Sequence, residues 1–298
     1  MSLIKKLKGT GVAVVTPFKN DFSIDFDAIK KLVDFLINNG IKYIVVQGTT
    51  GESSTMSDDE KIISREAFVK ANNNRIPLVL GFGSNDTNYL LNDLNKTDFT
   101  GYSAILSVTP YYNKPTMNGL FNHFSLLAKS STLPIILYNV PSRTGCNMLP
   151  DITIKLANEF ENIIGIKEAA GDLDQVKELI TNSPNDFLII SGDDNTAYQS
   201  VLMGGDGVIS VAAGCIPNEF SEIIRMSFEN NVSECKSKFK IIKPLLDFLF
   251  EEGNPSGVKA ALSFLNLCQN NLRLPLIPVS NQLKTKIQNS ITKIKKDY

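Results

Sequence analysis

The feature that most constrains the fold is an alternation that runs from residue 11 to residue 211. Short, mostly apolar runs of strand length alternate with longer stretches in which apolar residues recur at helical spacing. Eight such runs occur, at residues 11–16, 42–47, 77–82, 103–108, 134–139, 163–167, 187–191 and 207–211. Because the runs are almost continuously apolar, helices should cover both faces of each strand, as in a parallel sheet. The alternation predicts an α/β fold of eight β/α units.

Two of the stretches between these runs carry helix signals. SIDFDAIKKLVDFLINNG places Ile24, Ala28 and Leu32 on one face and ends in a glycine that favours termination. SDDEKIISREAFVKA opens with Ser57, and Glu60 three residues later completes a capping box. Both stretches are typical of amphipathic helices that pack against a sheet.

Eight consecutive units favour a closed (β/α)8 TIM barrel over the alternative, an open doubly wound sheet. The first run is not followed by G-x-G-x-x-G, and the glycines at 81 and 83 do not replace that motif. After residue 211 no strand pattern returns, and helix-like stretches follow at 219–230, 235–251 and 257–268, with a Lys-rich tail after residue 280. We assign residues 1–231 to the barrel, with 219–230 as its last helix, and residues 232–298 to a small C-terminal helical subdomain.

Charge and composition narrow the class of partner. Thirty Lys and Arg residues against 31 Asp and Glu residues give a net charge of −1, which offers no field to attract nucleic acid or an anionic membrane. No apolar stretch reaches the roughly 18 residues of a membrane span, and the N-terminus has no signal-peptide pattern. We therefore expect a cytoplasmic protein that acts on small molecules.

The sequence contains no metal-binding pattern. Cys146, Cys215, Cys235 and Cys268 are far apart and form no C-x-x-C pair, so neither a zinc site nor a disulfide framework is expected. The sole histidine, His123, lies in a helix-like stretch and is interpreted as an ordinary helix residue. We expect no metal and no organic cofactor.

Catalytic groups of a barrel of this kind lie where its strands end. Lys167 ends an apolar run, where loss of hydration favours the neutral amine that attacks ketones; the alternative is a lysine whose head reaches solvent. Tyr138 ends another run and is either a proton shuttle or a buried aromatic residue. Thr49 and Thr50 lie in a glycine-flanked turn suited to an anion, and Arg143 follows Pro141 in a loop where it could bind a carboxylate.

Together these motifs resemble the pyruvate-dependent class I aldolases, a family that includes dihydrodipicolinate synthases and N-acetylneuraminate lyases. The resemblance covers residues 9–278 through GTGVAVVTPF, GTTGES, VTPYYNKPT, YNVPSRTG, NIIGIKEAAGD, LIISGDD and GVISVAA. It implies that Lys167 forms a Schiff base with pyruvate and that Tyr138 relays protons. It also implies that Thr49 links Tyr138 to Tyr112, and that Thr50 holds the pyruvate carboxylate.

The same resemblance distinguishes two activities. In synthases, a residue matching Arg143 binds the carboxylate of L-aspartate 4-semialdehyde, and residues matching Ile209 and Gly192 line the pyruvate pocket. Sialic acid lyases lack this arginine and have Ser-Thr in the glycine turn. The resemblance therefore implies condensation of pyruvate with the semialdehyde to 4-hydroxy-tetrahydrodipicolinate, toward diaminopimelate and lysine. A sugar-acid lyase is the alternative. A non-enzymatic scaffold would lack part of the catalytic set, and none of that set is missing.

Assembly and regulation are also implied by the resemblance. Family members often form homotetramers, as dimers of dimers, in which the residue matching Tyr112 reaches a neighbouring active site. A lysine-binding allosteric site is matched only in part, by Ser53, Asn85 and Tyr111. Where its histidines and its glutamate are expected, the positions are Asp58, Lys61 and Tyr89. Because a carboxylate acceptor for the ligand's ammonium is lost, we expect weak or absent inhibition by lysine.

Overall fold

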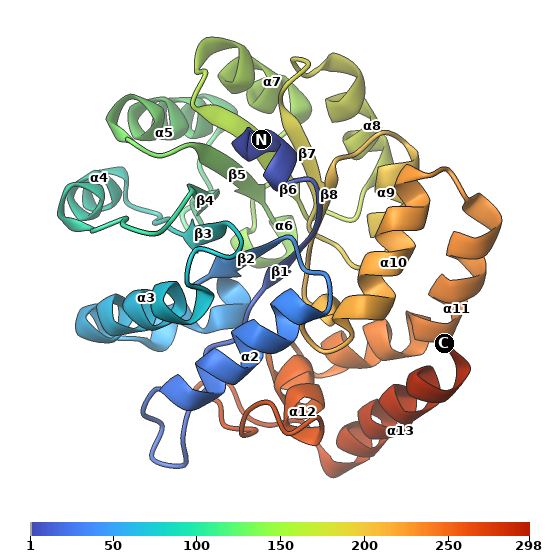
Figure 1. The fold of residues 1–298 in the computed structure, drawn as a ribbon. Helices are drawn as coiled ribbons and strands as arrows, with labels where there is room; N and C mark the ends of the chain where they lie inside the picture. The colour runs from blue at the N-terminus through green and yellow to red at the C-terminus, as the bar shows by residue number, and fades with distance from the viewer. Residues whose placement is uncertain (1) are drawn as a thin grey trace.

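The computed structural model describes residues 2–298 and contains a closed barrel of eight parallel strands (Figure 1). Each strand pairs with the next, and the first pairs with the last. The TIM barrel and all eight predicted strands are therefore confirmed, and the open doubly wound alternative is wrong. The strands are β1 (Gly9–Ala13), β2 (Tyr43–Val46), β3 (Leu78–Gly81), β4 (Ala104–Val108), β5 (Ile135–Asn139), β6 (Ile163–Glu168), β7 (Leu188–Ser191) and β8 (Gly207–Ser210).

Helices surround the barrel as an outer ring (Figure 1). The ring consists of α2 (Phe26–Asn38), α3 (Asp58–Asn72), α4 (Thr87–Lys96), α5 (Met117–Ser130), α7 (Pro150–Glu159), α8 (Leu173–Asn182), α9 (Ala197–Leu202) and α10 (Pro217–Phe228). Short helical turns are α1 (Leu3–Lys6), α6 (Pro141–Thr144), η1 (Thr49–Gly51), η2 (Ser53–Thr55) and η3 (Ala212–Gly214).

Local sequence signals fix where these helices begin. The predicted capping box of α3 is present, because Ser57 Oγ accepts a hydrogen bond from the Glu60 amide and the Glu60 carboxylate accepts one from the Ser57 amide. At the start of α2, the Asp25 carboxylate accepts from the Ala28 amide. Helix α2 then buries Ile29, Leu32 and Leu36, whereas the only apolar residue that α3 buries fully is Phe68.

The apolar core has two layers. One layer lies between strands and helices, and the other fills the barrel interior and includes Tyr43, Val45 and Ile136. Tyr43 begins β2 and is fully buried in the half of the barrel where the strands start. Its ring takes the space beside Gly11, where an added Cβ would come within 2.3 Å of the ring. The carboxyl ends of the strands are left for polar groups.

The first strand differs from its prediction. It spans Gly9–Ala13 instead of residues 11–16, because the chain leaves the barrel after Ala13. The buried Thr16 hydroxyl then donates a 2.7 Å hydrogen bond to the carbonyl of Gly51. The end of the predicted strand thus supports the glycine-flanked turn that follows β2.

Residues after the barrel form three helices, α11 (Val232–Glu251), α12 (Ser256–Phe264) and α13 (Asn281–Asp297), which pack against one another beside α2 and α10 (Figure 1). The Lys-rich tail is the amphipathic helix α13, which buries Leu283, Ile287 and Ile291. The helical extension is confirmed, whereas its division from the barrel at residue 231 stays a prediction. Among residues 2–298, no helix is long and apolar enough to cross a membrane.

Candidate active site

A cavity of about 220 Å³ lies at the carboxyl ends of the strands. Six predicted site residues line it, contributed by β5, β6 and the segments that follow β2, β5 and β7. They are Thr49, Thr50, Tyr138, Arg143, Lys167 and Gly192. Residues more than 140 positions apart in the chain therefore share one small space, as expected for a barrel whose strands all end at the same face.

Lys167 lies on β6 next to Tyr138 on β5, because these two residues are partners in the strand register. The lysine is buried, with 5% of its surface exposed. Its Nζ lies 4.2 Å from the centroid of the Tyr138 ring. Lys167 takes part in none of the ion pairs formed within residues 2–298. The cavity thus holds an amine without a counter-ion, beside a phenol.

Gly192 gives Lys167 its space. A Cβ at this position would lie 2.5 Å from the Ala169 Cβ and 2.9 Å from the Lys167 Cε, closer than side chains pack. Any side chain at this position would therefore displace the lysine. Gly192 therefore lines the cavity, and its lack of a side chain leaves room for Lys167.

Polar groups behind the cavity hold the ends of β5 and β6 together. Asn139 and Glu168, the residues after Tyr138 and Lys167, are also register partners, and Asn139 Nδ2 donates to both Glu168 oxygens at 2.9 and 3.1 Å. Gln175 Nε2 and the Ala170 amide donate to the same carboxylate. Burial raises the pKa of Glu168, and these hydrogen bonds oppose that rise. The network fixes the backbone that presents Lys167 and Tyr138.

The glycine-flanked turn folds as the 3-10 turn η1, which exposes Thr49 and buries Thr50. Thr50 Oγ1 accepts a 3.0 Å hydrogen bond from Nδ2 of Asn254, which lies between α11 and α12. Glu52 follows with a left-handed backbone, at a φ of 55°. Its fully buried carboxylate forms a 2.5 Å ion pair with the equally buried Lys259 of α12. The C-terminal helices are therefore attached directly to this turn.

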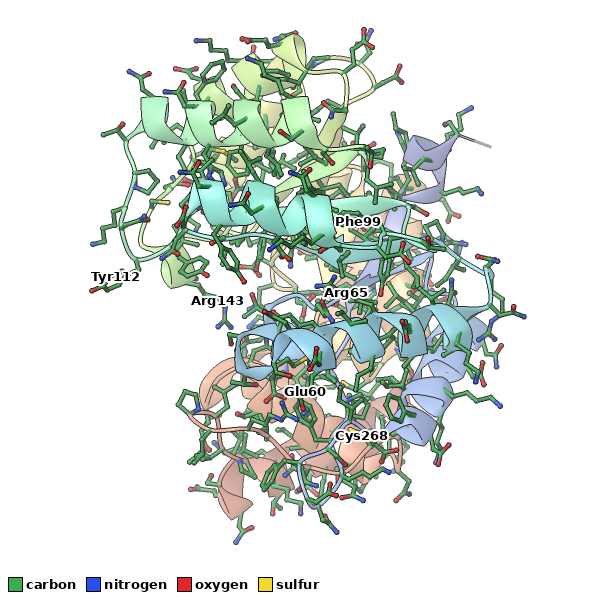
Figure 2. The ribbon with its side chains drawn as sticks, turned by 90° about the vertical axis from the view of Figure 1, so that its left-hand side faces the viewer. Glu60, Arg65, Phe99, Tyr112, Arg143 and Cys268 are labelled. Atoms are coloured by element: carbon green, nitrogen blue, oxygen red, sulfur yellow. The ribbon has the colours of Figure 1, made fainter. Side chains whose placement is uncertain are left out.

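Arg143 lies on a one-turn helix, not in the predicted loop. Helix α6 begins at Pro141, whose missing N–H suits the first position of a helix, and Gly145 ends it with a φ of 75°. The exposed Arg143 side chain extends from the barrel toward the orange C-terminal helices (Figure 2). Its Nη2 lies 3.5 Å from the Asn254 carbonyl. The short helix therefore directs a cation to the rim of the cavity.

Two predicted residues do not line the cavity. Ile209 is buried in the barrel interior, in the same apolar cluster as Tyr138 and Ile190, and does not contribute to the cavity lining. Tyr112 is 88% exposed and lies at the edge of the molecule, apart from Arg143 (Figure 2). Within residues 2–298 its hydroxyl makes no hydrogen bond to Thr49, so one chain alone does not form the expected hydroxyl relay.

The cavity also contains residues that the sequence did not single out. Asn254 and Phe250 come from the C-terminal segment, and no local pattern marked either as part of a site at the barrel mouth. Asp194 lies in the recognised LIISGDD motif but was assigned no role. Its buried carboxylate accepts hydrogen bonds from the Val211 and Ala212 amides, and burial raises its pKa to about 6.

Among residues 2–298, no cluster of three or more His, Cys, Asp or Glu side chains is arranged to hold a metal ion. The four cysteines are free. His123 lies in α5 as predicted, is buried, and has its Nδ1 2.8 Å from the Thr87 hydroxyl.

The partly matched allosteric residues are near the molecular surface. Asp58 and Lys61 form an ion pair of 3.1 Å with each other, one turn apart on α3. Asn85 Nδ2 donates to the Tyr111 carbonyl at 3.1 Å. Ser53 is half-buried, and Tyr89, at the position expected for a carboxylate, exposes 53% of its surface. These six residues therefore provide no carboxylate at position 89, where the resemblance predicts one.

Comparisons with known proteins agree with this geometry. The chain matches the dihydrodipicolinate synthetase family over residues 6–294. It is 49% identical over 279 residues to the 4-hydroxy-tetrahydrodipicolinate synthase of Flavobacterium psychrophilum, covering 94% of this chain and 95% of that protein. It is 44% identical to the enzyme of the same name from Cytophaga hutchinsonii, covering 97% of both.

Solved structures show the same fold. The dihydrodipicolinate synthase of Thermotoga maritima has a TM-score of 0.94 and 36% identity over 97% of this chain and 98% of that one. The chloride-inhibited enzyme of Acinetobacter baumannii, complexed with pyruvate, has a TM-score of 0.93 and 38% identity over 97% of this chain and 99% of that one. Both likenesses extend through the cavity and the C-terminal helices, and the chain belongs to the dihydrodipicolinate synthetase family.

Proposed function

We propose that this enzyme condenses pyruvate with L-aspartate 4-semialdehyde to give 4-hydroxy-tetrahydrodipicolinate. One observation supports the proposal most strongly. Lys167 lies in a small cavity without a counter-ion, and the Tyr138 phenol is beside it. The names and substrates of the relatives agree with this activity. Production of an intermediate for lysine and diaminopimelate is a cytoplasmic role, and the cysteines are free as in a reducing compartment.

The first half of the reaction uses the amine. Lys167 Nζ attacks the C2 carbonyl of pyruvate, and loss of water gives a protonated imine. This imine draws electrons from the methyl group, so a methyl proton leaves and an enamine forms. Tyr138, whose ring centroid lies 4.2 Å from the nitrogen, carries protons to and from the reacting atoms. Thr50 holds the pyruvate carboxylate.

The second half uses the cavity rim. The enamine carbon attacks the aldehyde of the semialdehyde, and one carbon–carbon bond forms. Arg143 holds the carboxylate of this substrate, which suits a guanidinium at the cavity rim. The amino group of the same substrate then attacks the imine carbon and displaces Lys167, which closes the ring. The proposed reaction needs no cofactor, and pyruvate takes part as a substrate that is bound covalently as the imine.

The proposal is tested by trapping the imine. Borohydride reduction in the presence of pyruvate should add the mass of a reduced pyruvate adduct to the peptide that contains Lys167. Omitting pyruvate is the control. An adduct on another residue, or none, would refute the mechanism. Offering L-aspartate 4-semialdehyde and, separately, N-acetylmannosamine to the pyruvate-loaded enzyme separates the synthase from the sugar-acid lyase, because the latter should use only the amino sugar.

Assembly is part of the proposal. The exposed Tyr112 side chain and the 40% exposed Tyr111 lie side by side on the segment that follows β4, so they can reach another subunit. We propose a homotetramer, a dimer of dimers, in which Tyr112 completes the relay in a neighbouring cavity. One solved relative with a TM-score of 0.94 is a monomeric variant, so measurement of the mass in solution by sedimentation is decisive.

Feedback by lysine is proposed to be weak or absent. The aromatic Tyr89 occupies the position expected for a carboxylate, and Asp58 is already paired with Lys61. An ammonium ligand would therefore lack its charge-assisted acceptor. Steady-state rates should stay nearly constant as L-lysine is added, and full inhibition at submillimolar lysine would overturn the proposal.

A further inference from the structure

Asn254 connects the C-terminal helices to the cavity. It is 7% exposed, lines the cavity and lies between the end of α11 and the start of α12. Its side chain contacts Thr50, and its carbonyl faces the guanidinium of Arg143. One residue from outside the barrel therefore reaches both groups that we propose to hold substrate carboxylates.

The hydrogen bond between Asn254 and Thr50 has a direction. The amide Nδ2 is only a donor, so the Thr50 hydroxyl oxygen must accept this bond. Its own hydrogen is then free for a different acceptor, and within residues 2–298 it donates to none. Because Thr50 lines the cavity, its hydroxyl can donate to a carboxylate placed there. Asn254 thus sets Thr50 as a donor.

Neighbouring contacts hold Asn254 in place. Gly257 packs so closely on the backbone of α11 that a Cβ would come within 2.2 Å of the Leu249 carbonyl. Lys259 lies on α12, as Gly257 does, and forms an ion pair with Glu52, which is two residues after Thr50. The turn and the start of α12 are therefore joined twice, and the spacing of Asn254 from Thr50 is fixed by packing and by charge.

We propose that Asn254 is a positioning residue for pyruvate binding. Its amide holds the Thr50 hydroxyl in the orientation that donates to the pyruvate carboxylate, and its carbonyl orients Arg143. The inference rests on the proposed function and adds to it a residue from the C-terminal helices. It makes these helices part of the active site.

Asn254→Asp tests the direction of the hydrogen bond. The substitution keeps the size of the side chain but replaces the donor with an acceptor, so Thr50 would donate to Asp and lose its hydrogen for the substrate. The new negative charge would also repel the substrate carboxylate. The KM for pyruvate should rise by about tenfold or more, the typical loss for a hydrogen bond to a charged group, with a smaller change in kcat. Asn254→Ala leaves the Thr50 hydroxyl free to rotate and should raise this KM less.

A second measurement separates binding from folding. The pyruvate concentration that gives half-maximal borohydride trapping should rise with the KM in both variants, while circular dichroism and Tm are recorded on the same samples. Asn231→Asp is the control for added charge, because it makes the same substitution at the N-cap of α11, at the opposite end of this helix from Asn254, where Asp and Asn cap equally well. It should bind pyruvate as the wild type does.

The outcomes are distinguishable. If Asn254→Asp lowers Tm but keeps the wild-type KM and trapping midpoint, Asn254 has a purely structural role and the inference fails while the proposed function stands. An equal KM shift in Asn231→Asp, or a larger one in Asn254→Ala than in Asn254→Asp, also overturns it. If the wild type forms no pyruvate adduct at all, the proposed function fails and the inference fails with it.

Discussion

Two buried lysines in this barrel have opposite surroundings. Lys167 and Lys259 are 5% and 0% exposed, and each places its Nζ 4.2 Å from the centroid of an aromatic ring, Tyr138 and Phe18 respectively. Lys259 is paired with Glu52 and also donates to the Asn271 carbonyl at 2.8 Å. Lys167 has neither kind of partner within residues 2–298 and lies in the cavity.

The difference shows that burial alone does not make a lysine reactive. Burial lowers the pKa of Lys259, and the neighbouring Glu52 carboxylate opposes this fall because the ion pair favours the charged form of the nitrogen. The nitrogen of Lys259 joins two segments, whereas the nitrogen of Lys167 has no ion-pair partner within residues 2–298 and faces the cavity. The first arrangement suits a structural role, and the second suits the catalytic role that we propose for Lys167. The following predictions test this distinction.

The largest effect is expected on activity at the unpaired site. Lys167→Met should lower kcat/KM by about three orders of magnitude or more, because the covalent intermediate cannot form. Its free energy of unfolding, measured by urea denaturation, should stay within about 1 kcal/mol of the wild type or rise, because no partner is left unpaired. A loss of about 3 kcal/mol would mean that Lys167 also stabilises the fold.

At the paired site the expected effect is on stability. Lys259→Met leaves the buried Glu52 carboxylate without its partner and should cost about 3–5 kcal/mol of unfolding free energy. The double variant Glu52→Gln/Lys259→Met should recover most of this loss, since no lone charge remains. Urea denaturation of the two single variants and the double variant gives the coupling energy. Additive losses would contradict the ion pair.

Gly192→Ala tests the space around the Lys167 amine. The added methyl would approach the Lys167 Cε to 2.9 Å and push the lysine away from its position. A displacement of this kind should lower kcat/KM by about 10². Gly214→Ala is the control, because a Cβ at that position meets nothing closer than 3.6 Å. Equal activities in the two variants would show that the position of Lys167 tolerates the shift.

His123 shows a third way to bury a basic group, and its effect is the smallest. Burial lowers the pKa of its imidazole to about 4. The unfolded chain binds a proton near the ordinary pKa of about 6.5, so the contribution of His123 to stability is full above that pH and is lost as the pH falls toward 4. The slope should be at most about 1.4 kcal/mol per pH unit. Because His123 is the sole histidine, its NMR titration measures the shift directly, and a midpoint near 6.5 would contradict it.

The fold was predictable because each barrel unit carries its own local signal. Apolar runs marked every strand, and Ser57 with Glu60 marked the start of α3. Lys167 and Tyr138 could be placed together because neighbouring strands of a barrel end at the same face. These features depend on short stretches of sequence and on a repeating topology.

The rest of the site depends on tertiary contacts that short stretches do not encode. Asn254 reaches Thr50 only because α11 and α12 fold back over the turn, and the two residues are 204 positions apart in a sequence that carries no sign of the contact. The helical turn beneath Arg143 is too short for periodicity to reveal. Ile209 follows the alternation of a strand correctly, but the depth of its side chain in the barrel wall depends on how neighbouring strands are staggered.

The attachment of α12 to the catalytic turn has a consequence for biosynthesis. Ribosomes make the chain from its N-terminus, so all eight strands exist before Asn254 and Lys259 are added. A growing chain of that length has Lys167 and Thr50 but lacks Asn254, the residue that we propose to position Thr50. The proposed role of Asn254 therefore implies that pyruvate binding reaches its full strength only after the helices that follow the barrel have been made.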